Sequence, residues 1–345
     1  MELPMDTPEE KKTKIIRTED YVWVDVRSPA EYQQGHVPGA YSLPLFSNEE
    51  RAEVGTIYAK SGKFAAIERG LEIVGPRLSR MLRQGKALSR KGKLMVYCWR
   101  GGMRSASVAW LLRLENVDLE VYPGGYKGYR RSFSDLLDLG WRFVVLGGPT
   151  LCGKTEILKT LAQQGEQVLD LEGMARHKGS AFGGLGQGEQ PNNEQFSNLL
   201  HFELEKMDPT RIVWCEGESL NIGKVTMPRE FYDLLDASPM IHLIIPKESR
   251  LQRAMTEYGS MPSKLLEDSF EKIKRRIGLD VAQKGISAIE NGDLKTAIAL
   301  AMDYYDKTYQ YALQKRKGPV LFRYQGLGVP KQMAEEIKEE SYKRL

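Results

Sequence analysis

A glycine-rich segment that ends in lysine and threonine constrains this chain more than any other feature. Residues 144–155 read VVLGGPTLCGKT, and residues 148–155 fit the pattern G-x-x-x-x-G-K-[ST]. An apolar run precedes the segment and a helical pattern follows it, as a phosphate-binding P-loop requires. We therefore expect the loop from Gly148 to Gly153 to hold phosphates through its backbone N–H groups. Lys154 would neutralise their charge, and Thr155 could bind Mg²⁺.

Acidic residues follow another apolar run and are candidates for the carboxylate that accompanies such a loop. Glu216 and Glu218 come directly after RIVWC at residues 211–215. Either carboxylate could orient a metal ion or its water. Asp170 and Glu172 close a further apolar run and are additional candidates.

Short apolar runs alternate with helical patterns along the chain, which predicts an α/β fold with parallel sheets. We expect strands at residues 21–25, 93–97 and 119–122, and a second series at residues 141–146, 167–171, 211–215 and 240–245. A glycine cluster at residues 123–130 closes the first series. The expected organisation is a flexible tail at 1–12, one α/β domain at 13–135, and a P-loop domain with a helical C-terminal portion at 136–345.

Composition fits a globular protein of a reducing compartment. The chain has 345 residues, 41% of them hydrophobic, and a net charge of +4, which permits an acidic partner such as RNA. Its three cysteines lack metal-ligand spacing, and the polar start MELPMDTPEEKK does not read as a signal peptide. No apolar run approaches the roughly 20 residues of a membrane span. We expect a cytoplasmic protein with no membrane partner.

A second glycine-rich loop surrounds a cysteine. The stretch YCWRGGMRS at residues 97–105 places Cys98 at the end of an apolar run, before Gly101 and Gly102. Glycines allow consecutive N–H groups to turn inward around an anion. Such a cradle, together with Arg100 and Arg104, would lower the thiol pKa and make Cys98 nucleophilic. The alternative is an inert cysteine buried at a strand end.

The segment DVRSPAEYQQGHVPGA at residues 25–40, with the cysteine loop, resembles the rhodanese domain. The matching residues are Asp25, Arg27, Glu31, Tyr32, Gly35, His36, Pro38, Gly39 and Ala40. The resemblance implies a scaffold role for Asp25 and His36. The loop from Cys98 to Arg104 is C-x5-R, one residue longer than in common sulfurtransferases of this fold and equal to that of the related phosphatases. Loop length alone therefore leaves sulfur transfer and phosphate ester hydrolysis both open.

Almost the entire chain resembles the tRNA 2-selenouridine synthase family, which joins a rhodanese domain to a P-loop domain. Further matches are DLEGMARHKGSAFG at residues 170–183 and EGESLNIGKVTMP at residues 216–228. QPNNEQFSNLL at residues 190–200 also matches, although Asn193 and Ser197 replace the family's Gln and Glu.

This resemblance implies a tRNA-modifying enzyme that replaces sulfur by selenium at carbon 2 of a wobble 2-thiouridine. The family is thought to alkylate the sulfur with geranyl diphosphate and then to displace the thiol with selenophosphate, which a separate synthetase supplies. The P-loop would hold the diphosphate and the cysteine loop the selenophosphate. Two other functions remain open: a sulfurtransferase or phosphatase with an accessory nucleotide-binding domain, and an ATP-driven RNA-binding protein.

Basic and aromatic residues are candidates for contact with the anticodon loop of tRNA. Trp99 and Tyr126 are candidates for stacking on an unpaired base. Lysines and arginines in three segments are candidates for phosphate contacts: Lys127, Arg130 and Arg131; the segment KIKRR at residues 272–276, which includes Lys274, Arg275 and Arg276; and residues 315–317.

Overall fold

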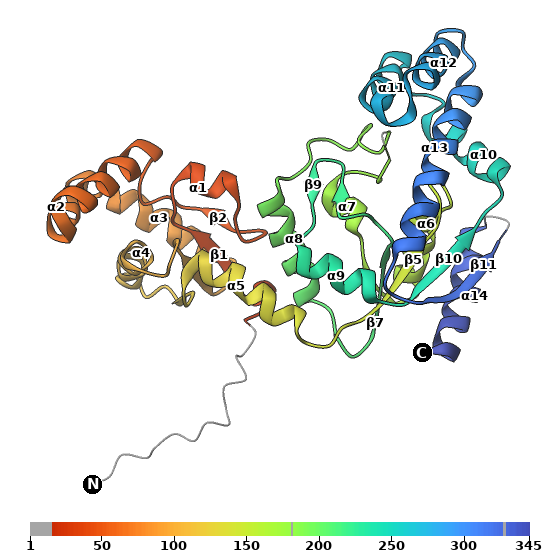
Figure 1. Ribbon diagram of the computed structural model, residues 1–345. Helices are drawn as coiled ribbons and strands as arrows, with labels where there is room; N and C mark the ends of the chain where they lie inside the picture. The colour runs from red at the N-terminus through yellow and green to blue at the C-terminus, as the bar shows by residue number, and fades with distance from the viewer. Residues whose placement is uncertain (1–15, 181, 327–328) are drawn as a thin grey trace. The chain divides into compact units, whose positions relative to one another are not determined.

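The computed structural model describes residues 16–180, 182–326 and 329–345 (Figure 1). The chain divides into two compact units, Met1–Arg130 and Arg131–Leu345, and each is described by itself. The tail expected at residues 1–12 lies outside the described residues. The expected α/β class is confirmed in both units.

The first unit contains a parallel sheet with the strand order β2-β1-β3-β4. Three of its strands fall where the apolar runs predicted them. The fourth, β2, has only two residues, both exposed, so no apolar run marks it. The strands are β1 (Val22–Asp25), β2 (Tyr41–Ser42), β3 (Leu94–Tyr97) and β4 (Leu119–Val121).

Helices cover both faces of this sheet because alternate strand residues point to opposite sides. Val24, Leu94 and Val96 pack with residues of α2 (Asn48–Val74), α3 (Leu78–Ser89) and α4 (Met103–Arg113). Trp23, Met95 and Tyr97 pack with the tyrosines of α5 (Gly125–Leu137) on the other side. The remaining helices of the unit are α1 (Pro29–Gln34) and the 3₁₀ turns Thr18–Asp20 and Gly75–Arg77.

The second unit contains a five-stranded parallel sheet with the order β11-β10-β5-β7-β6. Four strands lie where the sequence predicted them: β5 (Arg142–Gly147), β6 (Gln167–Leu169), β7 (Ile212–Glu216) and β10 (Met240–Ile244). The edge strand β11 (Val320–Gln325) was not predicted, and its residues are exposed or half-buried. A short antiparallel hairpin joins β8 (Asn221–Ile222) to β9 (Val225–Thr226).

Both faces of the second sheet are covered as well. On one face, Val144, Leu146 and Trp214 pack against α6 (Lys154–Gln163) and α14 (Pro330–Arg344). On the other, Phe143 and Val213 pack against α7 (Leu171–Ala175), α8 (Asn193–Glu205) and α9 (Arg229–Ala237). The P-loop leaves the end of the central strand β5, which places it at the carboxyl edge of the sheet.

The helical C-terminal portion has its own apolar core, in which Phe182, Phe270 and Met302 take part. It consists of α10 (Lys247–Tyr258), α11 (Ser263–Ile277), α12 (Leu279–Glu290) and α13 (Leu294–Lys315). In the described part of the chain, no helix combines the length and the apolar character needed to cross a membrane.

Candidate functional site

Cys98 follows β3 directly and lies at the floor of the loop that leads into α4. Only 3% of the residue is exposed. Its sulfur lies 3.3 Å from the hydroxyl of Ser105, which also donates a hydrogen bond to the carbonyl of Gly102 at 3.0 Å. The residue is therefore almost fully buried, but its sulfur has polar partners that a purely apolar site would lack.

A second glycine turn fixes the cysteine loop by close backbone contact. The N–H groups of Tyr126 and Lys127, in the first turn of α5, donate to the carbonyls of Cys98 and Trp99 at 2.8 and 3.0 Å. Gly125 has φ +59°, and a Cβ atom there would lie 2.3 Å from the carbonyl oxygen of Cys98 and from the nitrogen of Gly101. Only glycine permits this approach. The start of the glycine cluster at residues 123–130 thus supports the cysteine loop, a role that could not be predicted from the sequence pattern.

The electrostatic surroundings distinguish Cys98 from the other two cysteines. Burial alone would raise the pKa of its thiol, but hydrogen bonds from the Ser105 side chain and from the N–H groups of Ser105 and Arg100, with the charge of Arg104, lower it. Burial raises the pKa of Cys152 and of Cys215, so both are neutral thiols. Only a thiolate is a strong nucleophile, so Cys98 is the candidate reactive cysteine among the three.

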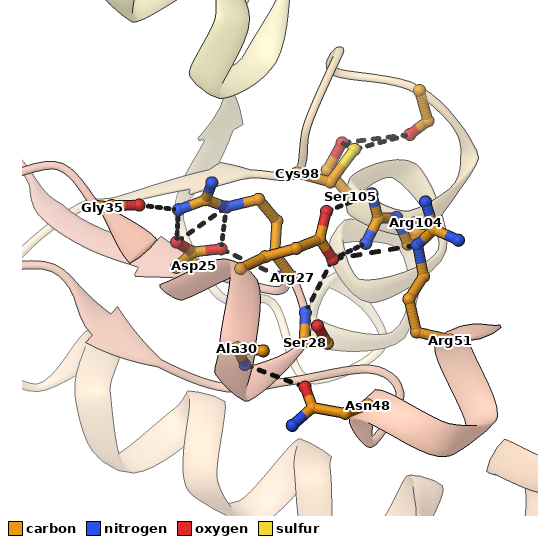
Figure 2. Close-up of polar contacts among 12 residues, drawn as sticks. Asp25, Arg27, Ser28, Ala30, Gly35, Asn48, Arg51, Cys98, Arg104 and Ser105 are labelled. Atoms are coloured by element: carbon orange, nitrogen blue, oxygen red, sulfur yellow. Dashed lines mark hydrogen bonds and ion pairs between the residues drawn. The ribbon is translucent and has the colours of Figure 1, made fainter. Parts of the chain in front are cut away.

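Arg104 is held in place by a residue from the first rhodanese-like motif (Figure 2). Its guanidinium donates to both carboxylate oxygens of Glu31, at 2.7 and 3.2 Å. Arg51 approaches the same carboxylate at 3.8 Å. Burial would raise the pKa of Glu31, but Arg104, the Ser28 N–H and Arg51 lower it, so the carboxylate stays ionised. Glu31 therefore connects the two motifs. The sequence alone offered one indication of this role, namely that Glu31 belongs to the first motif.

Asp25 and Arg27 form a buried pair beneath the loop. Arg27 Nη2 lies 2.6 Å from Asp25 Oδ2 and donates to the carbonyl of Gly35 as well, and both side chains are almost fully buried. His36 stacks on the ring of Tyr32. These contacts give Asp25 and His36 structural partners, in agreement with a scaffold role.

One proposed stacking residue requires a correction. Tyr126 is fully buried, and the guanidinium of Arg27 lies 3.8 Å from the centre of its ring. This ring is packed in the core and does not offer a face to a nucleobase. Trp99 is 37% exposed and so retains an accessible face, and Arg100 and Gly102 are exposed as well.

The second candidate centre is a cavity of about 310 Å³ around the P-loop. The loop residues Gly148, Gly153, Lys154 and Thr155 line it. Further basic residues at the cavity are Lys159, Lys178, Arg253 and Arg316. Arg253 Nη1 also donates to the carbonyl of Leu151 at 2.8 Å and so connects α10 to the loop. The cavity thus offers basic side chains and backbone N–H groups that suit a phosphate-bearing ligand, beside the acidic residues Glu156, Glu172, Glu218, Asp236 and Glu257 in the same lining.

Acidic residues flank the lysine of the P-loop. Lys154 Nζ lies 3.9 Å from Glu218 Oε1, and both groups are largely buried. Burial would lower the pKa of Lys154, but the nearby carboxyl groups of Glu218 and Glu172 raise it, so the ammonium stays charged. Burial raises the pKa of Glu218 to about 7; Lys154 opposes this shift and Glu172 adds to it. Glu218 therefore changes its charge near neutral pH.

The two acids that follow β7 occupy different places. Glu218 lines the cavity, whereas Glu216 does not. Glu216 accepts a hydrogen bond from the N–H of Leu171 at 3.0 Å, and burial together with Asp170 and Glu172 holds its pKa well above the ordinary value. Glu216 is therefore a neutral structural acid, and Glu218 is the carboxylate that faces the ligand site.

Glu172 is closer to the P-loop threonine than the sequence indicated. Thr155 Oγ1 donates to Glu172 Oε2 at 3.0 Å, and both residues line the cavity. Hydroxyl and carboxylate oxygens are ligands that Mg²⁺ accepts, so this pair fits the expected ion. Within the described residues, no group of three or more His, Cys, Asp or Glu side chains is arranged to hold a metal. A metal ion here would therefore depend on ligand phosphates and water for most of its coordination.

The basic segments lie on several elements. Lys127, Arg130 and Arg131 are exposed on α5. Lys274, Arg275 and Arg276 are exposed in the last turn of α11, where Lys274 also pairs with Glu271. Arg316 requires a correction: its side chain is largely buried and donates to the carbonyls of Leu235 and Ser238, so it is not available to RNA phosphates.

Comparisons with known proteins find matches to both parts of the chain. Residues 141–340 match the family described as tRNA 2-selenouridine synthase AAA domain, and residues 7–132 match the rhodanese-like domain. A tRNA 2-selenouridine synthase of Psychromonas ingrahamii is 31% identical over 87% of this chain and 90% of its own length. The tRNA 2-selenouridine synthase of Aeromonas salmonicida is 31% identical over 89% of this chain and 91% of its own length. That of Hydrogenovibrio crunogenus is 32% identical over 87% of this chain and 91% of its own length. A crystal structure of the N-terminal domain of a protein from Clostridium difficile 630, described as ATP/GTP binding, is 39% identical over 34% of this chain and 95% of its own, with a TM-score of 0.32.

Proposed function

Because the chain belongs to the tRNA 2-selenouridine synthase family and is an enzyme, we propose that it replaces the sulfur of a wobble 2-thiouridine in tRNA by selenium. The replacement takes place in two stages, one at each anion site. The observation that carries this proposal is the presence of two such sites in one chain, one formed around an activated thiol and one around a buried ammonium group.

In the first stage, the sulfur of 2-thiouridine attacks carbon 1 of geranyl diphosphate. A C–S bond forms, the C–O bond breaks, pyrophosphate leaves, and the nucleoside gives up one proton. Developing charge on the leaving diphosphate is stabilised by the P-loop N–H groups, by Lys154 and by Arg253. Mg²⁺, held by Thr155 beside Glu172, would supply further neutralisation of that charge.

The ionisation of Glu218 affects the same stage. A protonated Glu218 leaves the charge of Lys154 available to the diphosphate, whereas an ionised Glu218 competes for it at 3.9 Å. Since its pKa is about 7, both forms are present at neutral pH. Release of pyrophosphate is favoured when Glu218 is ionised.

In the second stage, selenophosphate, supplied by its synthetase, is bound at the cysteine loop. Its phosphate group is held by the loop N–H groups and Arg100, and Cys98 takes part in the exchange at carbon 2. The thiolate bonds to carbon 2, the bond from carbon 2 to the geranyl sulfur breaks, and the departing geranylthiolate takes a proton from water. The selenium atom then bonds to carbon 2 and displaces Cys98 as the thiolate. Water finally cleaves the P–Se bond, which releases phosphate and leaves 2-selenouridine. Nucleophilic catalysis of this kind divides one difficult displacement into two easier ones.

Transfer RNA binds through exposed basic residues and Trp99. Lys127 lies next to the loop that carries Trp99, because its N–H donates to the Trp99 carbonyl, and Arg130 follows it on α5. Lys274, Arg275 and Arg276 supply further phosphate contacts. Affinity for tRNA then falls with salt, with a slope of about −0.7 per phosphate contact in a single-stranded loop. A slope near zero would contradict this mode of binding.

The direct experiment is incubation of 2-thiouridine tRNA with the protein, geranyl diphosphate and selenophosphate, followed by mass spectrometry of the wobble nucleoside. We expect S-geranyl-2-thiouridine when selenophosphate is omitted and 2-selenouridine when both are present. The loop length C-x5-R also favours a phosphatase. Hydrolysis of an aryl phosphate without any change in the mass of the nucleoside would support that function and refute selenium transfer.

A further inference from the structure

The first unit contains an apolar groove that neither stage described above uses. Its volume is about 730 Å³, within the roughly 300–1,000 Å³ typical of ligand pockets. Residues of α2 and α4 form its two walls, with Leu45, Phe46 and Leu78 between them. The wall residues with the largest exposed surface are Tyr58, Leu71, Met103 and Trp110.

A break in α2 creates this groove. Gly62 has φ +87° and ψ 179°, so the helix divides into two arms at this residue. Tyr58 precedes the break, whereas Ile67 and Leu71 follow it, and all three line the groove. Trp110 is 60% exposed and Leu71 62% exposed, although both are large apolar side chains. Contiguous exposed apolar surface of this kind marks a binding site.

The lining of the groove includes Arg104, the last residue of the cysteine loop. Arg104 lines it and directly precedes Ser105, whose hydroxyl lies 3.3 Å from the Cys98 sulfur. Arg51 lines it as well, and both arginines converge on Glu31 (Figure 2). One carboxylate therefore faces two guanidinium groups, which leaves a net positive charge at this end. An apolar channel with a cationic end suits an alkyl chain carried by a molecule that bears phosphates.

We propose that this groove binds the geranyl chain of the S-geranylated nucleoside during the second stage. The inference rests on the proposed function, because only that function produces a ten-carbon chain on the sulfur next to the reacting carbon. The S-geranylated RNA fits better than free geranyl diphosphate, since the groove includes Arg104 of the cysteine loop in the first unit, whereas the P-loop cavity is formed by the second. The chain would hold carbon 2 near the thiol, and geranylthiol would depart along the groove.

The test measures affinity for anticodon stem–loop RNAs whose wobble 2-thiouridine carries an S-methyl, a five-carbon S-prenyl or a ten-carbon S-geranyl group. Full burial of each additional chain carbon would strengthen binding roughly fourfold. Because the groove is open on one side and buries each carbon only in part, we expect the affinity to rise roughly twofold per carbon. For the full-length protein we expect about 30-fold tighter binding of the geranyl than of the prenyl RNA. Equal affinities would overturn the proposal. Free geranyl diphosphate serves as a competitor; displacement of the geranyl RNA at equal concentration would assign the groove to the donor and also overturn it.

Variants locate the site on the structure. Leu71→Asp places a charge in the groove and should abolish the preference for the longer chain, and Trp110→Ala should reduce it about fivefold. Phe64→Asp is the matched control, because Phe64 is 80% exposed on the same helix and does not line the groove. It should retain the wild-type preference. An unchanged preference for the longer chain in both groove variants would refute the proposal. A change in the oligomeric state of these variants without a change in RNA affinity would also refute it, because the groove would then be an interface between copies of the protein.

Product analysis with the same proteins separates this proposal from the proposed function. The groove variants should form S-geranyl-2-thiouridine at the wild-type rate and convert it to 2-selenouridine more slowly at low RNA concentration. If the wild-type protein forms both products and the groove variants do so equally well, the groove assignment fails and the function stands. If the wild-type protein forms neither product but still prefers the longer chain, the function fails and the groove remains an alkyl-binding site.

Discussion

The hydroxyl of Ser105 is one of the groups that lower the pKa of the Cys98 thiol against the effect of burial, and removal of that hydroxyl measures its contribution. Ser105 has one hydroxyl hydrogen and two neighbours that accept it, the Gly102 carbonyl at 3.0 Å and the Cys98 sulfur at 3.3 Å. When the thiolate forms, the hydrogen turns toward the sulfur. A hydrogen bond to a charged group contributes about 1.5–3 kcal/mol and a neutral one about 0.5–1.5 kcal/mol. The net gain of about 1–1.5 kcal/mol corresponds to about one pKa unit.

We therefore expect Ser105→Ala to raise the pKa of Cys98 by about one unit and to slow its alkylation at pH 7 about tenfold. The assay is the pH dependence of the rate of reaction with iodoacetamide, followed by mass spectrometry that identifies the modified cysteine. Ser107→Ala is the matched control, because its hydroxyl lies on the same helix and bonds only the Met103 carbonyl among the described contacts. A Cys98 pKa that is equal in all three proteins, or a Cys98 that never reacts, would refute this account of thiol activation.

Three further outcomes follow from the same structure. Lys154→Met should weaken binding of inorganic pyrophosphate roughly 30- to 100-fold by calorimetry, since it removes the buried ammonium group; unchanged affinity would place the diphosphate elsewhere. The affinity of the wild-type protein for pyrophosphate should fall as pH rises through about 7, because Glu218 then becomes negative. Glu218→Gln should remove this fall. The same dependence of affinity on pH in the variant would contradict the role given to Glu218. Arg27→Met leaves the buried Asp25 carboxylate without its partner and should lower the free energy of unfolding, measured in urea, by about 3–5 kcal/mol. Arg69 is more exposed, so the Arg69→Met variant should be as stable as the wild type. Equal stability of the two variants would exclude a structural role for the Asp25–Arg27 pair.

The sequence predicted those parts of the molecule whose physical cause is local. Buried strands such as β3 and β7 are continuous apolar runs, and a P-loop requires a fixed order of glycine, lysine and threonine, so both can be recognised from neighbouring residues. The edge strand β11 escaped prediction because its residues are exposed or half-buried and carry no such run.

The residues that the sequence could not place are those brought together by tertiary contacts. Glu31 reaches Arg104 across 73 positions of the chain, and Arg253 reaches the P-loop across 102. Tyr126 failed as a stacking residue for the same reason, since it is buried in a cluster with Trp23 and Tyr97, which lie far from it in the chain. The preference for Glu218 over Glu216 at the cavity also required coordinates, because both acids follow the same strand.

The separation of the two stages by substitution tests the account most directly. Cys98→Ala and Lys154→Met proteins are incubated separately with tRNA, geranyl diphosphate and selenophosphate, and the wobble nucleosides are identified by mass spectrometry. We expect Cys98→Ala to accumulate S-geranyl-2-thiouridine without 2-selenouridine, and Lys154→Met to form neither product yet to convert RNA that is already geranylated. Undiminished 2-selenouridine from Cys98→Ala, or failure of Lys154→Met on geranylated RNA, would contradict the assignment of one stage to each site.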